Sequence, residues 1–169
     1  DGPSHHGIYD MALLSKVPGM RVLAPSSTQE VEQMLKDAIT LANEGPVVIR
    51  YPKGKARSVD AADIGSGLAA RKLLTDESNT VCILAIGKMV EASLDAAALL
   101  AAKGIMATVW DVRSCAPLDQ NMIDNAAAHK VIITVEDGIR EGGIGMTIED
   151  VVTHASGANR PTVEVLGIP

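Results

Sequence analysis

The sequence predicts an α/β fold in which an incomplete strand–helix–strand unit is followed by a complete, doubly wound domain. From residue 80 onward, apolar stretches of strand length alternate with helical stretches of about ten to sixteen residues, the pattern of βαβ units. A shorter strand–helix–strand pattern precedes it at residues 21–51. Residues 53–67 between the two are small, polar and without periodicity. We therefore expect two units joined by a linker.

The first unit begins with a loop and a short helix, followed by a strand at residues 21–24. Ser27 has the character of a helix N-cap, with Glu30 in the capping-box position. Apolar residues then recur at helical spacing: Val31, Met34, Leu35, Ala38, Ile39 and Ala42. Residues 46–51 form a second strand, which we expect to be buried and parallel to the first. Such a pair needs further strands beside it, so we expect the unit to continue upstream of Asp1.

The second unit alternates strands and helices to the end of the sequence. The predicted strands are residues 80–86, 105–112, 131–135 and 162–166, and the predicted helices are residues 88–103, 118–129 and 143–154. Gly104 ends the first of these helices, and Asp119 is a plausible N-cap for the second. His129 and His154 stand near helix C-termini, where we expect structural roles.

Composition and charge exclude several classes of protein. Among 169 residues, 47% are hydrophobic but only 2% are aromatic, which predicts a core of Ala, Val, Ile, Leu and Met. The net charge is −6 and basic residues form no run, so nucleic acid is not an expected partner. No stretch has the pattern of a membrane span or a signal peptide, which predicts a cytoplasmic protein without membrane contact. Cys82 and Cys115 lack metal-site spacing and are expected to be reduced thiols.

The N-terminal loop is the strongest candidate site because it gathers Asp1, His5 and His6, with Asp10 shortly after. Imidazoles exchange protons near neutral pH, and a neighbouring carboxylate fixes their tautomer. Substrate contact is the favoured interpretation, with a solvated loop as the first alternative. Zinc binding is a weaker alternative, because neighbouring side chains on an extended stretch point to opposite sides.

Arg50 and Lys53 form a second candidate site, at the carboxyl end of a predicted parallel strand. Ligands of open α/β sheets bind outside such ends, and two cations there suit an anion. Taken by themselves, the two residues are slightly better explained as solvated charges at the start of a linker.

The Gly-Gly-Ile-Gly turn at residues 142–145 resembles a phosphate cradle because it follows a strand and opens a helix. Its spacing is not that of a dinucleotide fold. Close packing of the helix against a strand or another subunit explains the glycines better. Glu136 and Asp137, at the end of the preceding strand, are weaker candidates for lining the same crevice.

Several motifs in order give the sequence a family resemblance. They are Asp-Gly-Pro-Ser-His at residues 1–5, Val-Pro-Gly-Met at 17–20, Arg-Tyr-Pro-Lys-Gly at 50–54, Val-Arg at 112–113, Pro-Leu-Asp at 117–119, Thr-Val-Glu-Asp at 134–137 and Gly-Gly-Ile-Gly at 142–145. The sequence thereby resembles thiamine-diphosphate enzymes of the transketolase superfamily, and among them the 1-deoxy-D-xylulose-5-phosphate synthases. These synthases condense pyruvate with glyceraldehyde 3-phosphate, release carbon dioxide and supply isoprenoid synthesis.

The resemblance implies a division of the chain. Residues 1–55 correspond to the last part of a pyrimidine-binding domain, residues 56–69 to a linker, and residues 70–169 to a transketolase C-terminal domain. Family members usually continue beyond the last strand, so a second truncation is expected at the C-terminus. The resemblance further implies a homodimeric parent enzyme that uses thiamine diphosphate and Mg²⁺.

The resemblance also assigns roles to individual residues. Asp1 and His5 would contact the substrate or the thiamine-bound intermediate. Lys53 falls where many members have an Arg that holds the acceptor's phosphate, and Arg50 stands beside it. Lysine keeps the charge but loses the bidentate fork of arginine. Ser4 and His6 replace the Thr and Gln of other members.

Two family features are absent from the sequence: the Gly-Asp-Gly stretch that holds magnesium and diphosphate, and the glutamate that activates the cofactor. We therefore expect this polypeptide to bind no cofactor and to be inactive alone. Within the superfamily, a transketolase or the beta subunit of a 2-oxo acid dehydrogenase is the alternative parent. A non-catalytic dimerisation module is the alternative outside enzymes.

Overall fold

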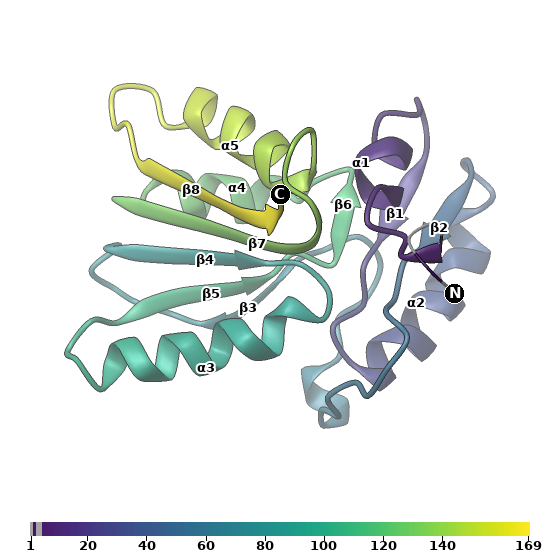
Figure 1. Ribbon diagram of the computed structural model, residues 1–169, viewed down its shortest axis with the longest axis horizontal. Coiled ribbons are helices and arrows are strands. Elements are labelled where there is room, and N and C mark those ends of the chain that lie inside the picture. Colours follow the sequence, from purple (N-terminus) through teal and green to yellow (C-terminus); the bar gives the residue numbers. More distant parts are fainter. Residues whose placement is uncertain (1, 3–4) are drawn as a thin grey trace.

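Two β-sheets organise this computed structural model, which describes residues 2 and 5–169 (Figure 1). In this part of the chain, a three-stranded sheet has the order β2-β1-β6 and a five-stranded sheet the order β3-β5-β4-β7-β8. The predicted α/β fold class is confirmed. None of the helices in these residues combines the length and apolar character that crossing a bilayer requires.

The first unit contains the predicted strand–helix–strand arrangement. Its elements are α1 (Asp10–Leu14), β1 (Arg21–Leu23), α2 (Thr28–Leu41) and β2 (Val47–Ile49). Strands β1 and β2 pair in parallel, and the Ser27 hydroxyl accepts a hydrogen bond from the Glu30 amide at 3.1 Å, which confirms the N-cap. The expectation of a buried second strand was wrong. Strand β2 is half-buried because it forms the edge of its sheet.

The second unit contains the predicted alternation and two strands that the sequence did not reveal, β3 and the short β6 (Ser114–Ala116). Its elements are β3 (Arg71–Leu74), β4 (Val81–Ala85), α3 (Met89–Ala101), β5 (Ala107–Asp111), α4 (Gln120–Ala127), β7 (Val131–Ile139), α5 (Ile144–Ala155) and β8 (Thr162–Ile168). Strands β4, β5, β7 and β8 are parallel, whereas β3 lies antiparallel at the edge. The carboxylate of Asp119 caps α4 as predicted. A 3₁₀ turn (Ala61–Asp63) precedes β3.

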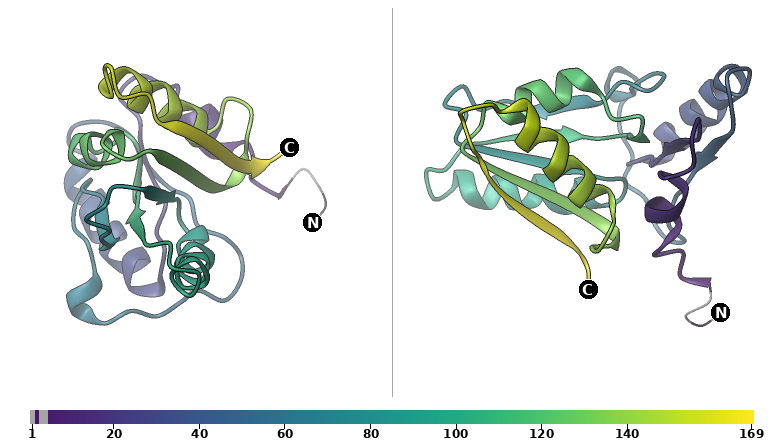
Figure 2. Two further views of the ribbon diagram at one scale, coloured as in Figure 1. Left: turned by 90° about the vertical axis from the view of Figure 1, so that its left-hand side faces the viewer. Right: turned by 90° about the horizontal axis from the view of Figure 1, so that it is seen from above.

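The sheet of the second unit is covered on both faces, with α3 on one side and α4 and α5 on the other (Figures 1 and 2). Alternating residues of β4 divide between two cores. Val81 and Ile83 pack on the side of α3, whereas Cys82 and Leu84 pack on the side of α4 and α5. Both cysteines are buried free thiols, as predicted. Burial raises the pKa of Cys82 to about 12.

A short strand of the second unit completes the sheet of the first. Strand β6 (Ser114–Ala116) follows β5 closely and pairs antiparallel with β1. Between β5 and β6 the chain turns at Arg113, which has a φ of 55° in the left-handed region. Non-glycine residues seldom adopt that conformation, so surrounding contacts must hold Arg113 in place.

The side chain of Arg113 makes those contacts as half of a fully buried ion pair. Its Nε donates to Glu30 Oε2 of α2 at 2.8 Å, and the two side chains are 0% and 2% exposed. One terminal nitrogen donates to the carbonyl oxygen of Ala69 at 2.5 Å. The other oxygen of Glu30 accepts from the Gly65 amide at 2.6 Å. The segment between the units is thus wrapped around the ion pair.

A second carboxylate lies beside this pair. Asp111 accepts a hydrogen bond from the Ser26 hydroxyl at 2.5 Å and one from the Arg113 amide at 3.3 Å. Burial raises the pKa of Asp111 to about 7, and the charge of Glu30 adds to the rise, while the Ser26 hydrogen bond and the Arg113 charge oppose it. Two buried carboxylates therefore lie beside Arg113 at the junction of the units: Glu30 is bonded to its guanidinium and Asp111 to its backbone amide.

We predict that this junction makes the stability of the protein depend on pH through Asp111. Because the folded-state pKa of Asp111 lies above the unfolded value of 3.8, its stabilising contribution is full below that value and is lost as the pH rises through about 7. The free energy of unfolding of the unmodified chain should therefore fall as the pH rises from 5 to 8. In the Asp111→Asn variant this fall should be smaller by about 2 kcal/mol, because the side chain no longer titrates.

Urea unfolding at the two pH values, followed by circular dichroism, measures this difference. The control is Asp95→Asn, since Asp95 is exposed on α3 and should leave the pH dependence unchanged. An Asp111→Asn variant with the pH dependence of the unmodified chain would contradict the prediction.

Candidate functional site

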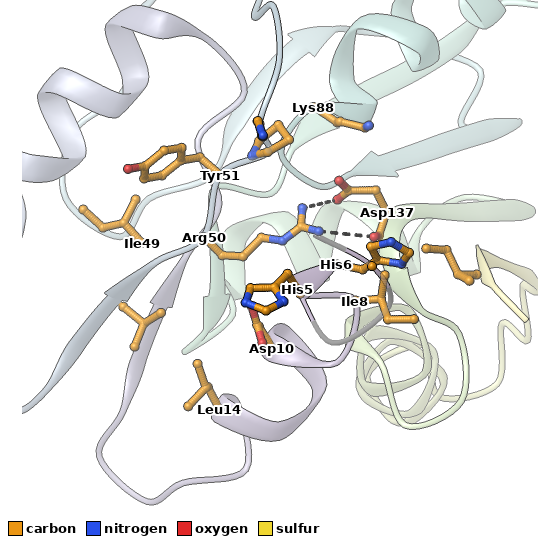
Figure 3. Close-up of a pocket in the computed structure, with 16 residues that line it drawn as sticks. His5, His6, Ile8, Asp10, Leu14, Ile49, Arg50, Tyr51, Lys88 and Asp137 are labelled. Carbon is orange, nitrogen blue, oxygen red and sulfur yellow. Dashed lines mark hydrogen bonds and ion pairs between the residues drawn. The ribbon is translucent and has the colours of Figure 1, made fainter.

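A cleft of about 710 Å³ lies between the two units (Figure 3). It is lined by Gly2, His5, His6, Gly7, Ile8, Asp10, Leu14, Val48, Ile49, Arg50, Tyr51, Pro52, Lys53, Lys88, Asp137 and Ile168. The predicted residues His5, Arg50 and Lys53 are therefore brought together, although His5 and Lys53 are far apart in sequence. Asp1 lies outside the described residues. The second unit contributes Lys88, Asp137 and Ile168, none of which we had assigned to this site from the sequence.

Arg50 crosses the cleft to the second unit. One terminal nitrogen donates to Asp137 Oδ1 at 2.5 Å, and the other donates to the backbone carbonyl of Asp137 at 3.3 Å. The two side chains are only 12% and 14% exposed. Both residues were predicted at carboxyl ends of strands, and the structure shows that these two ends face each other.

The imidazoles lie on the N-terminal side of the cleft. The loop turns at Gly7, whose φ is +64°, and leads into α1 at Asp10. Figure 3 shows the rings of His5 and His6 at different places along the cleft, as expected for neighbouring side chains. Within residues 2 and 5–169, no group of three or more His, Cys, Asp or Glu side chains is arranged to hold a metal ion.

A carboxylate of the chain itself binds at the Gly-Gly-Ile-Gly turn (residues 142–145). Glu136 is buried, and its Oε1 accepts from the Gly145 amide at 2.8 Å at the start of α5. Burial raises the pKa of Glu136, while hydrogen bonds from Gly145 and Ile144 oppose the rise. A carboxylate of the chain thus occupies the helix N-terminus where a phosphate would bind.

The glycines of this turn allow close packing. A Cβ atom on Gly145 would lie 2.5 Å from Thr134 Oγ1 and 2.7 Å from Val165 Cγ1. This contact confirms the packing interpretation over the phosphate cradle. Glu136 and Asp137 are neighbours on β7 but have different roles. Glu136 caps α5, and Asp137 lines the cleft.

The two remaining histidines do not line the cleft. His129 is fully buried, and its ring nitrogens lie 2.9 Å from Asn125 O and 3.0 Å from Thr108 Oγ1. His154 is exposed in the last turn of α5. The buried, hydrogen-bonded ring of His129 agrees with the structural role expected from the sequence, and His154 stands at a helix C-terminus as predicted.

Comparison with known families assigns the two units. Residues 1–59 match the model of the transketolase pyrimidine binding domain, and residues 70–169 match that of the transketolase C-terminal domain. The chain belongs to the transketolase family. The cleft therefore lies where the pyrimidine-binding part of a transketolase-family protein meets its C-terminal domain.

Among transketolase-family proteins, the chain is similar to 1-deoxy-D-xylulose-5-phosphate synthases over its whole length. It is 36% identical to that of Renibacterium salmoninarum and 38% identical to that of Paenarthrobacter aurescens. In each case the match covers 100% of this chain and 26% of the relative. The chain thus spans about a quarter of the length of these relatives.

Solved structures of the family have the same fold. One of them is described as a split-gene transketolase in an inactive β4 tetramer. The match covers 99% of this chain and 55% of the chain in that structure, with 30% identity and a TM-score of 0.86. Another is transketolase from Campylobacter jejuni. The match covers 100% of this chain and 24% of the transketolase chain, with 18% identity and a TM-score of 0.73. The second likeness concerns the fold alone.

We predict that Gly145→Ala destabilises the protein by about 1–3 kcal/mol, because the added methyl group overpacks the contact between α5 and the sheet. Chemical denaturation followed by circular dichroism measures the loss. Asp150→Ala, on an exposed position of the same helix, is the control and should stay within about 0.5 kcal/mol of the unmodified chain. Equal stability of the Gly145→Ala variant would contradict the packing explanation.

Proposed function

We propose that this chain is the C-terminal part of a thiamine-diphosphate-dependent transferase that condenses pyruvate with glyceraldehyde 3-phosphate to 1-deoxyxylulose 5-phosphate and releases carbon dioxide. The similarity to such synthases along the whole chain supports the proposal. The cleft that brings His5 together with Lys53 is the observation on which it chiefly depends. It offers a proton-exchanging group and a cation to one phosphorylated substrate.

The candidate residues predicted from the sequence have separate roles in this proposal. Lys53 provides a positive charge for the acceptor's phosphate. His5 hydrogen-bonds and exchanges a proton with an oxygen of the reacting substrate. The proposal gives Asp1 a contact with the same substrate. Arg50 was predicted as a second phosphate ligand, but its ion pair with Asp137 favours a supporting role.

Thiamine diphosphate would supply the electron sink that stabilises the carbanion derived from pyruvate. The sequence lacks the Gly-Asp-Gly stretch with which family members hold magnesium and the diphosphate. We therefore propose that cofactor and metal are anchored elsewhere in the parent protein, and that this polypeptide alone is inactive. We further propose a homodimeric, cytoplasmic parent, on the family resemblance.

A transketolase is the second candidate, since the chain is 30% identical to a structure described as a split-gene transketolase. Assaying the full-length parent with pyruvate and with xylulose 5-phosphate as donor separates the two. If the enzyme uses pyruvate but not xylulose 5-phosphate as donor, the synthase is supported. If it uses xylulose 5-phosphate but not pyruvate, the transketolase is supported.

The role of Lys53 is tested in the full-length parent with thiamine diphosphate and Mg²⁺. Lys53→Ala should raise the KM for glyceraldehyde 3-phosphate by about 10- to 100-fold, the worth of a charged hydrogen bond, while the KM for pyruvate changes little. Lys53→Arg should retain activity. Lys55→Ala is the matched control, because Lys55 does not line this cleft.

An unchanged KM in the Lys53→Ala enzyme would contradict the phosphate role. Product formation by the isolated 169-residue chain under the same conditions would contradict the claim that it is inactive.

A further inference from the structure

Asp137 stands out in the cleft because it is an acid beside a site proposed for an anion. We propose that Asp137 is a positioning residue: it holds Arg50 and thereby fixes the segment that presents Lys53 to the acceptor's phosphate. This inference rests on the proposed function of Lys53. It assigns to the C-terminal domain a part in substrate recognition.

The segment that leads to Lys53 is anchored at Arg50. The amide of Arg50 donates to the carbonyl of Leu23 in β1 at 2.8 Å, and its side chain reaches Asp137 on β7. Residues 51–53 then leave β2 without regular secondary structure. Arg50 is therefore held by both units immediately before the chain reaches Lys53, and Asp137 supplies the contact from the second unit.

Asp137 is itself held firmly by the strand that carries it. It lies near the end of β7, where the amides of Ile139 and Arg140 donate to Ile8 O and Ile168 O, each at 2.8 Å. Its neighbour Glu136 faces the opposite side of the strand and is bonded to α5. Asp137 thus offers Arg50 a carboxylate and a carbonyl oxygen from a strand held on both sides.

Both terminal nitrogens of Arg50 are engaged by Asp137. A carboxylate and a backbone carbonyl receive them, and both side chains are nearly buried. A bidentate phosphate contact from Arg50 would need this arrangement to change. The geometry therefore favours Lys53 as the phosphate ligand and Arg50 with Asp137 as its support.

Positioning and simple electrostatics predict opposite results. A carboxylate near an anion site is repulsive, so its removal should tighten phosphate binding if only charge mattered or if Arg50 were released to bind phosphate. If Asp137 positions the segment, its removal should weaken binding although a negative charge is lost.

The experiment titrates the chain with glycerol 3-phosphate, an unreactive three-carbon phosphate, by calorimetry. Asp137→Asn should raise the Kd about fivefold or more, and Asp137→Glu should restore part of the affinity. Lys53→Ala should remove most of the binding, and the double variant should bind no worse than Lys53→Ala alone, because the two residues act in sequence. Glu141→Gln, exposed and outside the cleft, is the charge-matched control and should bind like the unmodified chain.

The outcomes separate the inference from the proposed function. Unchanged or tighter binding by Asp137→Asn, with binding still lost in Lys53→Ala, overturns the positioning role and leaves the phosphate role of Lys53 intact. Absence of binding to the unmodified chain, or an unaffected Lys53→Ala variant, overturns both. Thermal unfolding of every variant shows whether a weakened affinity reflects unfolding, and the Asp137→Glu variant repeats the test with the charge retained.

Discussion

The buried ion pair between Arg113 and Glu30 is the constraint on which the relative arrangement of the two units depends. A fully buried charge is tolerated only when it is paired and hydrogen-bonded, so each of these residues requires the other unit. Arg113 also turns the chain between β5 and β6, and β6 completes the sheet of the first unit. The linking segment closes over the pair through Gly65, where a Cβ atom would lie 2.5 Å from the guanidinium carbon.

The cleft is a consequence of this arrangement, because its walls come from both units. The N-terminal loop supplies His5 and the segment after β2 supplies Lys53. The second unit supplies Lys88, Asp137 and Ile168. The Arg50–Asp137 pair is a second contact between the units, at the site itself. A transketolase C-terminal domain thus contributes directly to the candidate substrate site in this chain.

Sequence patterns predicted the elements whose signals are local. The caps at Ser27 and Asp119 and the helix that follows each cap depend on neighbouring residues, and the structure confirmed them. The apolar stripe of α2 is buried only in part, because Met34 is buried whereas Leu35 and Ile39 are exposed. Glu30 shows the limit of such signals: its amide meets the cap as expected, but its carboxylate serves Arg113, which is 83 residues away. The edge strand β3 is short and charged, so no apolar pattern marked it.

The candidate site was predictable in part for the same reason. Histidines on a glycine-rich loop and cations after a strand are local signals, and they identified His5, Arg50 and Lys53. The contribution of Asp137 depends on how two domains pack, which no local pattern records. Glu136 was equally ambiguous, since only the alternation of side chains on β7 separates its task from that of Asp137.

A double-mutant cycle on the buried pair tests most directly whether it joins the units. Unfolding of Arg113→Met, Glu30→Met and the double variant would be followed by fluorescence of Trp110, the single tryptophan. Each single variant should lose about 3–5 kcal/mol because it leaves an unpaired buried charge, and the double variant should lose clearly less than the sum. Additive losses, or single losses under about 1 kcal/mol, would contradict the central place given to this pair.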